Sequence, residues 1–143
     1  MRVVSVSISK EKGTKKIPVS YIEIKKDHGI IGDAHAGNWH RQISLLGIES
    51  LNKMKLEFPN LSAGDFAENI LTEGIELYNL SVGTVLEIGN TKIEVTQIGK
   101  ECHKGCEIRK ITGDCVMPRE GIFGIVLKEG KIFPGDSINF IER

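Results

Sequence analysis

Short stretches in which apolar and polar residues alternate run along this chain, and glycines separate them. Near the N-terminus, Val4, Val6 and Ile8 alternate with serines, which is the period-two pattern of a half-buried strand. Ile22 and Ile24 share one face of a second expected strand. Both stretches are short enough to be strands of one small sheet.

The C-terminal half repeats this pattern more densely. Val85–Ile88 and Thr91–Ile98 flank a Gly-Asn pair, a two-residue loop typical of a tight hairpin. Further strands are expected at Ile122–Leu127, Lys131–Phe133 and Ser137–Ile141, the last after a Pro-Gly-Asp turn. At least six short strands with glycine turns predict a mainly β protein, an antiparallel barrel or sandwich.

One stretch has the periodicity of a helix instead. Its apolar residues recur at steps of three and four: Ile48, Leu51, Met54 and Phe58. Pro59 ends the pattern, and Ser44 or Gly47 would cap its start. We expect this helix to pack on one side of the sheet through these four residues.

Length and charge exclude several classes of protein. The chain has 143 residues, which predicts one domain spanning residues 1–143. Nineteen basic residues balance nineteen acidic ones, so a protein that binds nucleic acid or an anionic membrane is not expected. No apolar run approaches the ~20 residues of a membrane span, and no signal peptide is recognised. A cytoplasmic location is expected.

The three cysteines lie together rather than spread along the chain. Cys102, Cys106 and Cys115 are an odd number in a short segment, which argues against a disulfide scaffold. Basic neighbours such as Lys104 would favour a thiolate. Three interpretations stay open: one reactive cysteine, a zinc site that also uses His103, or buried inert thiols.

Two polar segments are further candidates for a site. The first holds Asp33 and His35 among small residues, followed by Arg41, and would present an acid, an imidazole and a cation to a ligand. The second lies in an irregular stretch and offers three polar residues: Asp65, Glu68 and Asn69. Each segment could instead only satisfy its own turns, with the acidic groups capping backbone amides. Arg119 is a further candidate for binding an anion.

These segments occur in an order that resembles the MOSC domain, named for the C-terminal domain of molybdenum cofactor sulfurase. The matching pieces are Gly32-Asp33-x-His35-x-Gly37, Arg41-Gln42-Ile43-Ser44, Gly64-Asp65-Phe66-x-Glu68-Asn69-Ile70, Val82-Gly83, Gln97-x5-His103, Met117-Pro118-Arg119-x-Gly121-Ile122-Phe123 and Gly135-Asp136. Each piece alone is weak, but their ordered combination over most of the chain is specific.

The resemblance implies a closed or partly open β-barrel like the inserted domain of pyruvate kinase, with at least one helix packed on it. It also implies binding of molybdenum cofactor (molybdopterin). The residues expected to bind it are Asp33, His35, Arg41, Asp65, Glu68, Asn69 and Arg119. Cys102 occupies the family's cysteine position, as the reactive residue and as a metal ligand, whereas Cys106 and Cys115 have no family equivalent.

The chain lacks the aminotransferase-like half of the sulfurases, so it would not use pyridoxal phosphate itself. The main hypothesis is a sulfur carrier or sulfurtransferase that forms a persulfide on Cys102, with a cysteine desulfurase or a molybdoenzyme as partner. The alternatives are a small molybdenum-dependent reductase of N-hydroxylated compounds and a non-catalytic cofactor carrier or structural zinc module. Whether the protein is an enzyme is left open.

Overall fold

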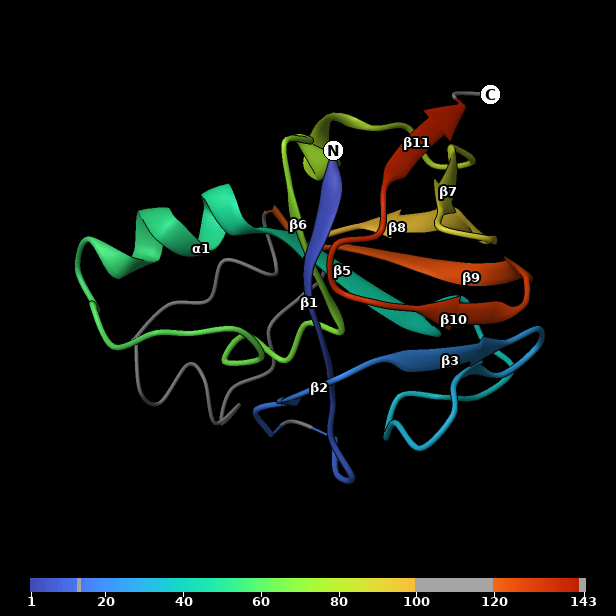
Figure 1. Ribbon diagram of the computed structural model, residues 1–143, viewed down its shortest axis with the longest axis horizontal. Helices are drawn as coiled ribbons and strands as arrows, with labels where there is room; N and C mark the ends of the chain where they lie inside the picture. The colour runs from blue at the N-terminus through green and yellow to red at the C-terminus, as the bar shows by residue number, and fades with distance from the viewer. Residues whose placement is uncertain (13, 100–119, 142–143) are drawn as a thin grey trace.

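Strands make up most of the ordered secondary structure. The computed structural model describes residues 1–12, 14–99 and 120–141. Eight strands form a large sheet (Figure 1): β1 (Arg2–Ile8), β2 (Ile17–Val19), β5 (Ile43–Gly47), β6 (Ile70–Glu73), β7 (Val85–Ile88), β8 (Thr91–Ile98), β9 (Ile122–Lys128) and β11 (Ile138–Ile141). A smaller sheet contains β3 (Ile22–Lys25), β4 (Gly29–Ile30) and β10 (Gly130–Ile132). The described residues also form one α-helix, α1 (Ile48–Lys55), and one 3-10 turn, η1 (Leu77–Asn79). The prediction of a mainly β protein with little helix is confirmed.

The large sheet does not close into a barrel within the described residues. Its strand order is β11-β7-β8-β9-β5-β6-β1-β2. One bridge, between Arg2 and Ser137, connects the start of β1 to the turn before β11. The Val3 N–H donates to the Asp136 carbonyl beside it, at 2.9 Å. The end of β1, from Val6 to Ile8, pairs with β2 instead, and a closed barrel is not found among the described strands. The likeness to the pyruvate kinase domain stays a prediction.

Strands β5 and β6 run parallel, although the strand spacing predicted antiparallel neighbours. Leu45 lies opposite Ile70 and Leu46 opposite Leu71. A parallel pair needs a long crossover, and α1 with the following loop provides it. All other ladders among the described strands are antiparallel.

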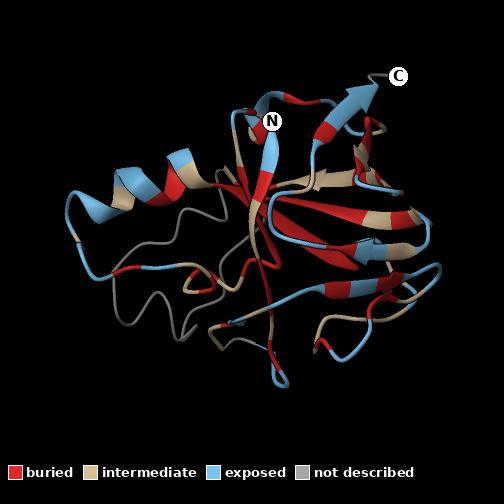
Figure 2. Cartoon of the chain, in the orientation of Figure 1, coloured by how far each residue is buried: buried red, intermediate tan, exposed pale blue. Residues whose placement is uncertain are grey.

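Two apolar clusters form the core (Figure 2). The larger lies among the strands and includes Val6, Ile43 and Ile93, all fully buried. The smaller cluster lies beneath α1: Leu51 is buried in it, and Ile48, Met54 and Phe58 pack against it, as predicted. The helix ends at Lys55, earlier than predicted, so Phe58 packs there from the chain that follows it. Gly47 is the N-cap and gives no side-chain hydrogen bond, and Ser44 belongs to β5.

A β-bulge changes which face of β1 each residue occupies. The register against β6 shifts between Val3 and Ser5. As a result Val3 and Val6 both enter the larger cluster, while Val4 packs against the smaller one. The simple alternation expected for Val4, Val6 and Ile8 is therefore wrong at Val4, because a bulge rotates the strand by one position.

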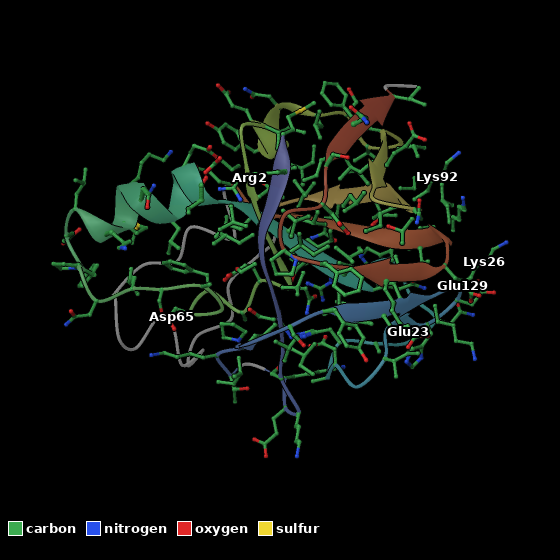
Figure 3. All side chains as sticks on the ribbon, in the orientation of Figure 1. Arg2, Glu23, Lys26, Asp65, Lys92 and Glu129 are labelled. Atoms are coloured by element: carbon green, nitrogen blue, oxygen red, sulfur yellow. The ribbon has the colours of Figure 1, made fainter. Side chains whose placement is uncertain are left out.

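The remaining strand predictions hold at the level of individual strands. The hairpin β7–β8 turns at Gly89, whose φ of 55° is in the left-handed region that glycine accepts easily. Strand β10 follows β9 along the chain but pairs with β3 in the smaller sheet. At the turn between β9 and β10, the Lys26 N–H donates to Glu129 Oε2 at 2.9 Å (Figure 3).

Candidate functional site

A buried lysine stands at the centre of the candidate site. The side chains of Lys16 and Asp33 are both completely shielded from solvent, and Lys16 Nζ lies 2.8 Å from Asp33 Oδ1. Lys16 Nζ is also 3.0 Å from Ser9 Oγ and 3.0 Å from His35 Nδ1. An ammonium group has three protons to donate, and these polar atoms lie within its hydrogen-bonding distance. A buried charge needs such complete pairing, so these residues form one unit.

Asp33 holds the segment around it in place as well as balancing the lysine. Its Oδ1 accepts the Ser9 N–H at 3.1 Å, and its Oδ2 accepts the His35 N–H at 3.0 Å. The side chain of His35 stays 25% exposed. The carboxylate is thus fully engaged inside the protein, whereas the imidazole reaches the surface.

The main chain of Lys16 contacts the second polar segment. Its N–H donates to the Gly64 carbonyl at 2.8 Å. Gly64 has a φ of +88°, and a Cβ placed there would lie 2.0 Å from the Lys16 carbonyl oxygen. Only glycine fits this approach. Lys16 therefore joins the two polar segments, through its side chain on one side and its backbone on the other.

Within the second segment, Glu68 binds backbone amides. Its carboxylate accepts the Gly64 N–H at 2.5 Å and the Phe66 N–H at 3.1 Å, and Glu68 is only 1% exposed. Burial raises the pKa of Glu68 from 4.5 to about 7, although these amide hydrogen bonds oppose the rise. Asp65 accepts the Ser62 N–H at 2.9 Å at the partly exposed start of the same turn (Figure 3).

Asn69 connects the end of this segment to two strands. Its Oδ1 accepts the Ser44 N–H at 3.0 Å, and its Nδ2 donates to the Ser7 carbonyl at 3.1 Å. Ser44 Oγ accepts the Asn69 N–H in return, at 3.0 Å. Asn69 is buried, so these bonds link β5, β1 and the start of β6 in the interior.

Arg41 lies between aromatic rings. Its guanidinium carbon is 4.7 Å from the centre of the Trp39 ring and 5.6 Å from that of Phe123. The Arg41 Nε is buried and has no hydrogen-bond partner among the described residues. Lys12 Nζ also lies 5.3 Å from the Trp39 ring, so two cations surround this indole.

Trp39 connects Arg41 to the lysine cluster. Its Nε1 donates to the His35 carbonyl at 2.8 Å, while its ring stacks with the guanidinium. The site therefore combines fixed positive charge, a partly exposed imidazole and a buried guanidinium nitrogen that has no acceptor in the described part of the chain. Such a set is suited to binding an anion that also offers hydrogen-bond acceptors.

The predicted site residues thus fall into three groups. Asp33 and His35 contact Lys16, and Trp39 links the His35 carbonyl to the Arg41 guanidinium. The segment with Asp65, Glu68 and Asn69 is connected to them by the bond between the Lys16 N–H and the Gly64 carbonyl. Cys102 and Arg119 lie outside the described residues. In the described part of the chain, no three His, Cys, Asp or Glu side chains are arranged to hold a metal ion.

Sequence reasoning missed Lys16 and Trp39. Lys16 follows several other lysines in a charged segment, and nothing in its neighbours distinguishes a buried ammonium from a solvated one. The nearest signal is Pro18 two residues later, which indicates a strand edge rather than a loop in solvent. Trp39 is the one tryptophan in the chain and stands between His35 and Arg41 in sequence, and this position is a signal that could have indicated its place in the site.

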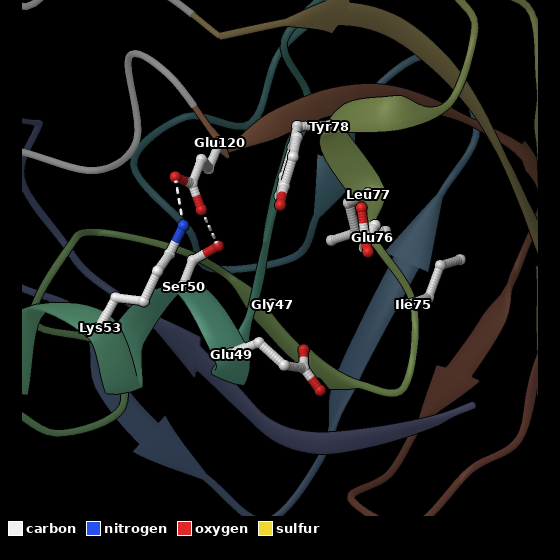
Figure 4. A pocket seen from close by; sticks show the side chains of 9 residues that line it. All are labelled: Gly47, Glu49, Ser50, Lys53, Ile75, Glu76, Leu77, Tyr78 and Glu120. Atoms are coloured by element: carbon white, nitrogen blue, oxygen red, sulfur yellow. Dashed lines mark hydrogen bonds and ion pairs between the residues drawn. The ribbon is translucent and has the colours of Figure 1, made fainter.

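A separate cavity of about 260 Å³ lies beside the N-terminal end of α1 (Figure 4). Its lining includes three carboxylates, Glu49, Glu76 and Glu120, and also Leu77. Glu120 accepts hydrogen bonds from Ser50 Oγ at 2.6 Å and from Lys53 Nζ at 2.7 Å. None of the predicted site residues that the structure describes is among the residues lining this cavity.

Comparison with known proteins assigns the family. The model of the MOSC domain matches residues 32–139, which include Asp33, Arg41 and the whole segment from Gly64 to Asn69. The chain belongs to the MOSC domain family. No curated protein matches the sequence.

Three solved structures resemble this chain in fold. YuaD protein from Bacillus subtilis is 19% identical, with a TM-score of 0.82 over 99% of this chain and 96% of that one. YiiM from Geobacillus stearothermophilus is 20% identical, with a TM-score of 0.75 over 99% and 75% of the two chains. YiiM from Escherichia coli is 21% identical, with a TM-score of 0.70 over 100% and 71%. At these identities the likeness concerns the fold.

The described residues of this MOSC protein contain no helix with the length and apolar character needed to span a bilayer.

Proposed function

We propose that this MOSC protein binds a molybdenum–pterin cofactor, or a close anionic relative, and carries sulfur on Cys102. The observation that carries the proposal is the buried Arg41 Nε, which has no hydrogen-bond partner among the described residues of a chain of this family. An anionic ligand would supply the acceptor that this nitrogen lacks. The free energy of leaving such a group unpaired, about 1–3 kcal/mol, would then favour binding.

The described residues fit the charged part of such a cofactor. Arg41 would hold its phosphate, with Arg119 as a second cation, and His35 would donate to an acceptor atom. Asp65 is the member of its segment that reaches the surface, and its contact with the pterin edge remains a prediction. Glu68 and Asn69 direct their described hydrogen bonds to backbone groups in the protein interior. We therefore propose that they hold the Asp65 segment in place.

The bound cofactor would supply a molybdenum centre that accepts sulfur or undergoes redox change. Sulfur would reach the protein by attack of the Cys102 thiolate on the terminal sulfur of a donor persulfide. The new S–S bond forms on Cys102, the donor S–S bond breaks, and the donor cysteine leaves as a thiolate. A cysteine desulfurase is the kind of partner that offers such a persulfide.

The first experiment measures what the protein binds. Protein purified from cells that make the cofactor is analysed for molybdenum, tungsten, zinc and pterin, beside Cys102→Ala and Arg41→Gln. We expect pterin and metal in the wild type and a loss of pterin in Arg41→Gln. Wild-type protein with no pterin would refute cofactor binding, and stoichiometric zinc alone would indicate a structural metal site.

The second experiment tests sulfur carriage. The protein is incubated with a cysteine desulfurase and cysteine, and each cysteine is analysed by mass spectrometry for one added sulfur. Cys106→Ala and Cys115→Ala are matched controls that should keep the modification, whereas Cys102→Ala should lose it. Added sulfur that persists in Cys102→Ala would exclude this cysteine as the carrier.

A further inference from the structure

The charged segment that follows β1 is held against the segment that contains Asp33. The Ala34 N–H donates to the Ser9 carbonyl at 2.8 Å, and the Ser9 N–H donates to Asp33 Oδ1 at 3.1 Å. The Ser9 hydroxyl donates to the Glu11 carbonyl at 3.1 Å, so the chain turns directly after β1. Lys12 is the next residue and is exposed.

This turn brings Lys12 to the same indole ring as Arg41. Lys12 Nζ lies 5.3 Å from the centre of the Trp39 ring, and the Arg41 guanidinium carbon lies 4.7 Å from it. Because both distances are measured to one point, the two positive centres are at most about 10 Å apart. A cation within about 6 Å of an indole is attracted by the electrons of the ring. Trp39 therefore gathers two cations from two separate segments of the chain.

Neither cation is neutralised within the part of the chain that the structure describes. No carboxylate there forms an ion pair with Lys12 or Arg41, and Asp33 is paired with Lys16. The Arg41 Nε is buried and has no acceptor among the same residues. At physiological salt, charges are screened over about 8 Å, so two cations at this separation still repel each other. An anion placed between them would remove the repulsion and supply acceptors.

We propose that Lys12 is a second binding residue for the anion, and that Trp39 positions it beside Arg41. The two cations bind one compact oxyanion of the phosphate class with two negative charges. The planar Arg41 guanidinium binds two of its oxygens, and the Lys12 ammonium binds another as a point charge. Charge-assisted hydrogen bonds are about 2.7–2.9 Å long, so both side chains reach oxygens of a phosphate or diphosphate group. The cofactor as the source of this phosphate rests on the proposed function.

Fluorescence of the ligand-free protein tests the contact with the indole. Trp39 is the one tryptophan in the chain, so tryptophan emission reports on this ring alone. Lys12→Gln should shift the emission maximum because it removes a charge beside the ring. Lys10→Gln makes the same change at another exposed lysine of the segment and should leave the emission unchanged. No shift in Lys12→Gln, or an equal shift in both variants, would overturn the role of Trp39.

Titration with inorganic phosphate and diphosphate, at constant ionic strength, tests the binding site. Calorimetry should show saturable binding to the wild type and about tenfold weaker binding to Lys12→Gln, the effect of one lost charge-assisted hydrogen bond. Lys12→Arg and Lys10→Gln should stay within twofold of the wild type. A wild type without saturable binding, or equal losses in Lys12→Gln and Lys10→Gln, would overturn the proposal. Lys12 is exposed, so its replacement should leave the thermal unfolding midpoint unchanged.

Pterin content of the same variants separates the two sources of phosphate. Loss of pterin in Lys12→Gln, with retention in Lys10→Gln, would support the cofactor as the molecule that Lys12 and Arg41 hold. Unchanged pterin in Lys12→Gln, despite weaker phosphate binding, would exclude the cofactor phosphate from this position and support free phosphate instead. If wild-type protein holds no pterin, the proposed function fails, while the phosphate titration still decides the role of Lys12.

Discussion

Glu68 should make the stability of this protein fall as the pH rises from acidic to neutral. The folded-state pKa of about 7 lies above the ordinary value of 4.5. Between these values the folded protein keeps a proton on Glu68 that the unfolded chain has released. Raising the pH through this interval therefore favours the unfolded state.

The size of the effect follows from the difference in pKa. Each unit corresponds to about 1.36 kcal/mol, so the interval from 4.5 to about 7 is equivalent to about 3 kcal/mol of the free energy of unfolding. Desolvation is the cause, because Glu68 is almost fully buried. Amide hydrogen bonds from Gly64 and Phe66 keep the pKa from rising further.

Urea unfolding at a series of pH values, for wild type and Glu68→Gln, measures this contribution. The variant cannot ionise, so the stability difference between the two proteins isolates Glu68 from every other titrating group. We expect the wild type to lose about 3 kcal/mol relative to the variant between pH 4 and pH 8. Parallel stability curves, or a wild type that gains relative stability with pH, would refute the assignment.

Three further substitutions probe the site. Gly64→Ala should destabilise the protein far more than Gly83→Ala. Both glycines have a positive φ, which costs an alanine about 1–2 kcal/mol. Only at Gly64 would the new Cβ also lie against the Lys16 carbonyl. Thermal unfolding checks this, and equal losses would contradict the close approach. Asn69→Ala should cost about 3 kcal/mol in urea unfolding by leaving buried groups unpaired, and a loss below ~1 kcal/mol would speak against its linking role. Arg41→Lys should lower pterin content about tenfold despite keeping the charge, because an ammonium lacks the planar fork; unchanged content would exclude bidentate binding.

Local patterns predicted much of the fold. The helix, the hairpin at Gly89 and the last strand all depend on residues close together in sequence, and each formed as expected. The parallel pairing of β5 with β6 could not be predicted from local patterns. Ile70–Glu73 lies in an irregular stretch, and its partner is chosen by long-range packing around α1 rather than by its own pattern.

The candidate site was predicted in part for the same reason. Asp33, His35 and Arg41 stand close in sequence, and the structure connects them: Asp33 binds the His35 N–H, Trp39 binds the His35 carbonyl, and Arg41 lies over the Trp39 ring. The backbone of Lys16 packs closely against Gly64, forty-eight residues later, and donates a hydrogen bond to its carbonyl. No local sequence pattern encodes such a long-range contact. The sequence could not predict that Glu68 and Asn69 bind groups inside the protein, because a buried carboxylate or amide cannot be distinguished from an exposed one by its sequence.

The close approach of Gly64 to Lys16 also has a consequence for how the chain folds. The hairpin β7–β8 closes a two-residue loop and can form early. The contact between Lys16 and Gly64 closes a much longer loop, which costs more conformational entropy. Gly64 sits in the crossover that leads to β6, which itself lies between β5 and β1. We therefore expect the hairpin to be structured before Gly64 meets Lys16, so that a newly made chain would complete the polar cluster around Lys16 only in the final stage of folding.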